Sequence, residues 1–187
     1  MISIMSGSLI ERLSALAERE RRLKAGQLLF RANDAVLSLF LVTSGEVRLV
    51  RPLPHGAPLT LQRAGPGTLL AEASLFAERY HCDAVASEAA VLRVVPARRL
   101  KAILGEDASL ASEFMRHLAH EVQRSRTQAE TLSLKTVAER LDAWASLNGG
   151  ALPDKGRGRR VAAELGVSPE ALYRELARRR RPGAGAR

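Results

Sequence analysis

The chain has 187 residues, of which 46% are hydrophobic and 26% are charged, and its formal net charge is +9. This composition is typical of a soluble globular protein of one or two domains and excludes a wholly disordered chain. One cysteine cannot form an internal disulfide or supply a four-cysteine zinc or iron–sulfur site, so we expect a cytoplasmic protein. No segment approaches the roughly 18 uninterrupted apolar residues of a membrane helix, and we expect no membrane partner.

Positive charge is concentrated at the C-terminal end. Residues 155–187 carry ten basic and three acidic side chains, a net charge of +7, whereas residues 105–154 have a net charge of −3 and residues 1–104 of +5. Such a basic segment attracts a polyanion, because lysine and arginine side chains displace counterions from phosphates. The alternative is a solvated basic tail without a specific partner.

The first half of the chain is β-rich. Apolar residues at helical spacing predict a short amphipathic helix between Leu9 and Leu23. Short β-prone runs separated by turn residues then predict a sandwich or barrel, with strands at Leu28–Phe30, Leu37–Val42, Val47–Val50, Leu59–Leu61, Cys82–Ala86 and Ala90–Val95. The proline-rich stretch Pro52–Pro58 predicts a hairpin loop.

A long helix is predicted from about Asp107 to Leu132, with Asp107 or Ser109 as its N-cap. Its narrow apolar seam consists of Leu110, Phe114, Leu118 and Val122. The seam could pair with the same helix of a second copy in a parallel coiled coil, or pack against the chain's own β domain. A further helix is predicted at Leu134–Leu147, ended by Asn148–Gly150 and followed by a flexible linker, Pro153–Gly158.

The segment Arg160–Leu176 has the pattern of a helix-turn-helix. Val161, Ala162 and Leu165 form the apolar face of a first helix, and Gly166 suits the left-handed turn between two helices. Ser168 is the predicted N-cap of the second helix and Pro169 its first residue. Two close-packed helices of this kind are typical of DNA-binding proteins, although an ordinary helical hairpin with a polar outer face fits the same pattern.

The outward residues of the second helix are candidate DNA contacts. Ser168, Pro169, Glu170, Tyr173 and Arg174 lie near its start, where base edges are read. Arginine can donate two hydrogen bonds to guanine, and glutamate can accept one from cytosine. The run Arg178–Arg181 follows, and we expect Arg178 and Arg179 to contact phosphates.

The order of these parts resembles that of the Crp/Fnr family of bacterial transcription regulators. The residues that carry the resemblance are Ser44-Gly45-Glu46-Val47-Arg48-Leu49, Gly65-Pro66-Gly67, Ala71-Glu72-Ala73-Ser74-Leu75-Phe76 and Cys82-Asp83-Ala84-Val85-Ala86. The resemblance implies an α+β fold: an N-terminal double-stranded β-helix (jelly roll) sensor at 1–104, a dimerisation helix at 105–132 and a helix-turn-helix domain at 133–187. It also implies a homodimer that binds double-stranded DNA, with RNA polymerase as a candidate partner.

The same resemblance places an effector pocket at Ala71, Glu72, Ala73, Cys82 and Asp83. In cyclic-nucleotide-binding relatives, an arginine and a hydroxyl residue stand where this chain has Cys82 and Asp83, whereas the glutamate that would bind the ribose is present as Glu72. Loss of the guanidinium and gain of a carboxylate make the site unsuited to an anionic phosphate. We therefore expect an effector other than cyclic AMP.

The adjacent His81 and Cys82 suggest a haem or redox interpretation, because both residue types are axial haem ligands. Neighbouring strand residues point to opposite faces, however, and Cys82 as a small core residue is the alternative. His117 and His120 lie three positions apart on the long helix without an evident third ligand, so we assign no metal site. We also assign no catalytic residues, because the chain has no phosphate loop, paired carboxylates or nucleophile with a base.

Relatives of this family usually place a β-hairpin wing after the recognition helix, but no strand pattern follows Leu176 here. The first hypothesis is a sequence-specific, dimeric transcription regulator of the Crp/Fnr type that is not an enzyme. The alternative is an effector-binding or protein-interaction module whose degenerate DNA-binding domain does not read sequence.

Overall fold

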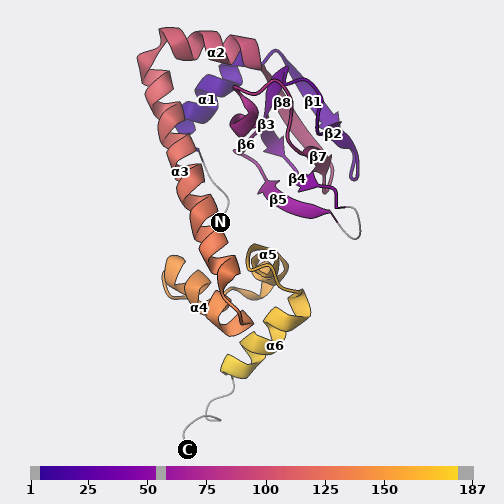
Figure 1. Ribbon diagram of the computed structural model, residues 1–187, viewed down its shortest axis with the longest axis vertical. Helices are drawn as coiled ribbons and strands as arrows, with labels where there is room; N and C mark the ends of the chain where they lie inside the picture. Colours follow the sequence, from indigo (N-terminus) through magenta and orange to yellow (C-terminus); the bar gives the residue numbers. More distant parts are fainter. Residues whose placement is uncertain (1–4, 54–57, 181–187) are drawn as a thin grey trace, which may run out of the picture. The chain divides into compact units, whose positions relative to one another are not determined.

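The computed structural model describes residues 5–53 and 58–180 (Figure 1). The chain forms two compact units, which meet in sequence between Ala119 and His120. Across these described ranges, no helix is both long enough and apolar enough to span a membrane.

The N-terminal unit is built on two antiparallel sheets of four strands each (Figure 1). One sheet has the order β1-β8-β3-β6 and the other β2-β7-β4-β5. The strands are β1 (Arg19–Leu23), β2 (Leu28–Phe30), β3 (Ser38–Ser44), β4 (Val47–Arg51), β5 (Leu59–Ala64), β6 (Leu69–Leu70), β7 (Asp83–Ala86) and β8 (Ala90–Pro96). Strands β4 and β5 pair antiparallel, which confirms the predicted hairpin; residues 54–57 of its loop lie outside the described residues.

The sheet that contains β3 is buried on both faces. Phe40 and Val42 point into the core between the two sheets, whereas Leu39 and Leu41 point into a second apolar cluster. This second cluster is formed with α1 (Gly7–Leu16), α2 (Ala97–Glu106) and the first turns of α3 (Ala108–Ser133). Alternation of side chains along one strand thus serves two cores, and the predicted α+β class with an N-terminal β-roll is confirmed.

The predicted first helix is wrong in its second half. Helix α1 ends at Leu16, and Arg19–Leu23 forms the edge strand β1, paired with β8 from Arg19 opposite Val94 to Leu23 opposite Ala90. Charged residues fill most of this segment, so it offers no apolar helical face, and the backbone of β8 supplies the hydrogen bonds instead.

Asp107 is the residue that separates α2 from α3. Its backbone is extended, and its Oδ1 accepts a hydrogen bond of 2.9 Å from the Leu110 backbone N–H. This bond lowers the pKa of Asp107, and the guanidinium of Arg12, its ion-pair partner, adds to the effect. Asp107 rather than Ser109 is therefore the N-cap of the long helix.

The C-terminal unit contains the remaining helices. These are α4 (Val137–Leu147), the 3₁₀ turn η2 (Lys155–Arg157), α5 (Gly158–Glu164) and α6 (Pro169–Arg180). Helix α4 starts at Val137 and not at the predicted Leu134, because Thr136 and Glu139 form a capping box. Its predicted stop is confirmed, since Gly149 and Gly150 both have positive φ. The predicted linker is partly ordered as η2 and the first residue of α5.

Candidate nucleic-acid interface and effector pocket

The turn between α5 and α6 is a Schellman motif. The N–H of Val167 donates to the carbonyl of Ala162 at 3.0 Å, and the N–H of Gly166 donates to the carbonyl of Ala163 at 3.3 Å. Gly166 has a φ of +62°, and a Cβ at this position would lie 2.6 Å from Leu132 Cδ2. The backbone conformation therefore favours glycine, as the sequence predicted, and a side chain here would also have to displace Leu132.

The start of α6 has the predicted register. The Ala171 N–H donates to Ser168 Oγ at 3.2 Å, and Pro169 is the first helical residue. The buried face of the helix packs with α4 and α5 in one cluster, formed by Leu141, Val161, Ala162, Leu165, Leu172 and Leu176. The helix-turn-helix prediction is thus confirmed as structure. Its outward side presents exposed Ser168, Glu170, Tyr173 and Arg174, with Pro169 half-buried.

Tyr173 lies over the start of α5. A Cβ at Gly158 would be 2.5 Å from the Tyr173 hydroxyl oxygen, so the absence of a side chain at Gly158 allows this approach. Gly158 is buried, whereas its neighbours Arg157 and Arg159 are exposed. The sequence assigned this glycine to a linker; its position just before a helix was the available signal for a close contact.

Glu170 is held in its ionised form at the start of α6. Its pKa is lowered mainly because its own backbone N–H donates to the carboxylate, and the Ser168 hydroxyl also contributes. The positive charges of Arg174 and Arg159 lower it further. A carboxylate in the first turn of a helix is also favoured by the helix dipole.

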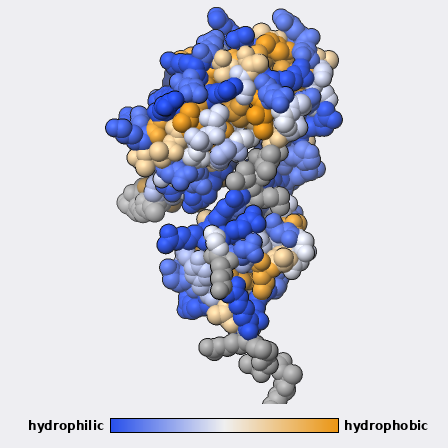
Figure 2. All heavy atoms as spheres, turned by 180° about the vertical axis from the view of Figure 1, so that it is seen from behind, coloured by the Kyte–Doolittle hydropathy of each residue, from blue (hydrophilic) through white to orange (hydrophobic). Residues whose placement is uncertain are grey.

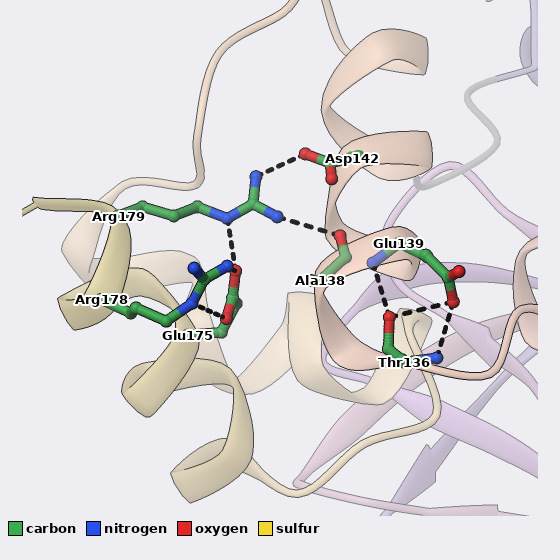
Figure 3. Close-up of polar contacts among 7 residues, drawn as sticks. All are labelled: Thr136, Ala138, Glu139, Asp142, Glu175, Arg178 and Arg179. Carbon is green, nitrogen blue, oxygen red and sulfur yellow. Dashed lines mark hydrogen bonds and ion pairs between the residues drawn. The ribbon is translucent and has the colours of Figure 1, made fainter. Parts of the chain in front are cut away.

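Arg178 and Arg179 form hydrogen bonds with other residues of the C-terminal unit (Figure 3). Arg178 forms two hydrogen bonds, of 2.9 and 2.8 Å, to the Glu175 carboxylate. Arg179 donates to Glu175 Oε1 at 2.7 Å, to the Ala138 carbonyl at 3.0 Å and to Asp142 of α4. Hydrogen bonds from Arg178 and then Arg179 lower the pKa of Glu175 to about 2.

These contacts change the expectation for the two arginines. The Arg179 side chain is only 20% exposed and joins α6 to α4, so its guanidinium is not free for phosphate. The Arg178 side chain is 69% exposed, but its charge is balanced by Glu175. The sequence missed this arrangement because Asp142 is distant along the chain.

Arg140 forms a second polar centre that the sequence did not indicate. Its guanidinium donates to the carbonyls of Leu134 at 2.9 Å, Leu132 at 3.0 Å and Leu165 at 2.9 Å. One side chain thus joins the C-terminal end of α3 to the turn of the helix-turn-helix.

The five predicted pocket residues have different environments. Ala71 is buried with a φ of +68°, Glu72 is half-buried at the start of η1 (Glu72–Ser74), and Ala73 is exposed. Cys82 is 2% exposed within the core between the sheets, and this burial raises the pKa of its thiol. The Asp83 carboxylate accepts a 2.7 Å hydrogen bond from the Ala32 N–H, so it binds a loop backbone.

The haem interpretation finds no support. His81 is exposed and its Nδ1 lies 3.2 Å from the Ser74 hydroxyl, whereas Cys82 points into the core. The two side chains therefore have different surroundings, as strand alternation predicted. Among residues 5–53 and 58–180, histidine, cysteine and acidic side chains form no group of three or more that could hold a metal ion.

A groove of about 590 Å³ lies between α1 and the sheet of β3 and β8. Its lining combines apolar and polar residues: Ile10, Glu11, Ser14, Ala15, Leu41, Val42, Thr43, Gly67 and Arg93. None of the five predicted pocket residues is among them.

The predicted dimer seam divides into two parts. Leu110 and Phe114 are buried in the second cluster of the N-terminal unit, and Leu118 packs against the same cluster. The alternative interpretation, packing on the chain's own β domain, therefore holds for this part of the helix. Val122 is 49% exposed, and Met115, outside the predicted seam, is 62% exposed.

Comparisons with known proteins show what this chain is similar to. Residues 20–107 match the family model described as cyclic nucleotide-binding domain. The chain is 24% identical over 140 residues to the fumarate and nitrate reduction regulatory protein of Vibrio cholerae, and 27% identical over 132 residues to the transcriptional activator protein anr of Pseudomonas aeruginosa. The chain is therefore similar to regulators of the Crp/Fnr type. These alignments cover 75% and 71% of this chain but 56% and 54% of the two relatives, so the chain spans about half the length of the relatives it matches.

The comparison of folds agrees with this similarity. The solved structure of FixK2 from Bradyrhizobium japonicum matches with a TM-score of 0.69 at 20% identity, and the match covers 89% of each chain. At this identity the match supports the β-roll and helix-turn-helix fold of the chain and carries no residue roles.

Proposed function

We propose that the protein is a dimeric, sequence-specific DNA-binding transcription regulator and not an enzyme, with RNA polymerase as a candidate partner. The observation that carries the proposal is helix α6, which a Schellman turn and a buried leucine face hold in place while Ser168, Glu170 and Arg174 stay exposed at its start. The names of the matched relatives, a regulatory protein and a transcriptional activator, support the same reading.

The exposed residues have the chemistry that base recognition needs. Arg174 can donate two hydrogen bonds to guanine, and ionised Glu170 can accept from the amino group of cytosine. Ser168 and Tyr173 can bind phosphate or sugar, which orients the helix in the major groove without reading sequence. Pro169 preorganises the first turn.

The dimer is proposed to use a face of α3 that shares only Val122 with the predicted seam. Met115, Val122 and Ala129 are exposed and lie seven positions apart. A heptad spacing is the pattern with which two parallel helices pair. We retain Val122 from the predicted seam, and assign Leu110 and Phe114 to the N-terminal unit's own core.

The effector is proposed to be a molecule other than cyclic AMP. By the resemblance, Cys82 stands where relatives have the phosphate-binding arginine; its thiol is buried, and the neighbouring Asp83 is a carboxylate. Such surroundings do not offset the charge of a cyclic phosphate. We keep the segments 1–104, 105–132 and 133–187 as proposed sensor, dimerisation and DNA-binding regions.

A gel-shift titration tests the function. Wild-type protein is titrated onto DNA from upstream of its own gene and onto random DNA at moderate salt, and we expect clearly tighter binding of the upstream DNA. A ratio near one would favour the alternative, a module with a degenerate DNA-binding domain. Arg174→Ala should remove discrimination at one base position per half-site at a cost of about 1–3 kcal/mol. Arg98→Ala is the matched control, because Arg98 is an exposed arginine on α2 of the N-terminal unit.

A further inference from the structure

Two arginines at the start of α5 are exposed and carry charge that no carboxylate balances by direct contact. Arg157 and Arg159 flank the buried Gly158. Within residues 58–180 and 5–53, neither arginine forms an ion pair, whereas the adjacent Arg160 pairs with Glu164 at 3.2 Å. Both side chains are exposed, and Tyr173 covers the Gly158 backbone between them in sequence.

The Tyr173 contact brings these arginines beside the outward face of α6. The Tyr173 ring lies directly over Gly158, so Arg157 and Arg159 are one residue away from that contact in each direction. Arg159 is also close enough to Glu170 to lower the pKa of its carboxylate. Arg174 follows Glu170 by one helical turn, and its charge also lowers the pKa of that carboxylate, so Arg159 and Arg174 both lie near Glu170.

The arginines at the other end of α6 are in the opposite situation. Glu175 binds Arg178 and Arg179 together, and Asp142 also binds Arg179. A DNA phosphate would have to displace these carboxylates before it could pair with either guanidinium. Figure 3 shows both side chains directed at acidic partners.

We propose that Arg157 and Arg159, rather than Arg178 and Arg179, contact the DNA phosphates beside the recognition helix. This inference rests on the proposed function and names the residues that anchor the same site. The first helix of a helix-turn-helix crosses the DNA backbone, so cationic side chains at its start face phosphates. Arginine pairs with phosphate through two parallel hydrogen bonds.

The salt dependence of binding tests the proposal. Two variants of equal charge change in the C-terminal unit are compared with wild type: Arg157→Gln with Arg159→Gln, and Arg178→Gln with Arg179→Gln. Fluorescence anisotropy with labelled upstream and random duplexes gives the slope of log Kobs against log salt. Each lost phosphate contact lowers this slope by about 0.9, so the first variant should lose about 1.8 per bound protomer and weaken both duplexes equally. In the second variant, the slope should fall by less than about 0.9.

Equal slope losses in the two variants, or an unchanged slope in the first, would overturn the proposal. Urea unfolding followed by Trp144 fluorescence controls for folding, because Trp144 is the one tryptophan of the chain and lies in α4. Failure of the proposed function gives a different result. Wild type that binds both duplexes equally refutes sequence reading but still allows the two slopes to be compared, whereas wild type that binds neither overturns both proposals.

Discussion

Replacement of Arg140 by alanine should destabilise the C-terminal unit strongly. The change removes hydrogen bonds of 2.9, 3.0 and 2.9 Å to the carbonyls of Leu134, Leu132 and Leu165. Hydrogen bonds to charged groups contribute about 1.5–3 kcal/mol each. Because Arg140 is half-buried and water can reach part of the site, the expected loss is that of one to two such bonds, about 2–3 kcal/mol.

Trp144 provides the assay. It lies in α4 of the same unit, and its Nε1 donates to Glu164 Oε2 at 2.9 Å, so its fluorescence should change when the unit unfolds. Urea titrations give the free energy of unfolding for wild type and Arg140→Ala. Arg126→Ala, on the exposed part of α3 in the same unit, should stay within about 0.5 kcal/mol of wild type.

Arg140→Lys separates charge from geometry. Lysine keeps the positive charge, but its single ammonium cannot reach three carbonyls in the fork arrangement of a guanidinium. We expect Arg140→Lys to recover less than half of the unfolding free energy that Arg140→Ala loses. A loss under about 0.5 kcal/mol in Arg140→Ala would refute the reasoning, since it would mean that water replaces the guanidinium at no net cost.

Further predictions concern the turn, the acidic centre and the thiol. Gly166→Ala should lower the free energy of unfolding by about 1–2 kcal/mol because of the left-handed backbone alone. In urea unfolding, adding Leu132→Ala to this variant should recover only the further loss that comes from the contact with Leu132. The pKa of Glu175 is depressed to about 2, so its stabilisation should be full above about pH 4.3, the pKa of an unfolded glutamate, and fall as the pH approaches 2. The difference in unfolding free energy between wild type and Glu175→Gln should therefore shrink over that interval; a constant difference would contradict the assignment. Burial raises the pKa of the Cys82 thiol, so iodoacetamide should label it at the rate of unfolding, and rapid labelling of native protein would show an accessible thiol.

The elements that sequence predicted correctly are those whose limits depend on neighbouring residues. The Gly166 turn and the Pro169 helix start depend on backbone groups within a few positions, whereas the structure decided between Asp107 and Ser109 as N-cap. Such contacts form within a short segment independently of the rest of the fold, so residue type and spacing were sufficient to predict them. The alternation of β3 side chains between the two faces of the sheet likewise follows from residue order.

Tertiary structure decided the features that depend on distant partners. Arg19–Leu23 became a strand because β8, some seventy positions later, offers its edge. Arg179 became a link between helices because folding brings Asp142 to it, and the charge of Arg157 and Arg159 stays available because no acidic side chain of the described chain pairs with them. A count of charges shows that the C-terminal segment is basic, but only the positions of the carboxylates determine which arginines are free to bind DNA.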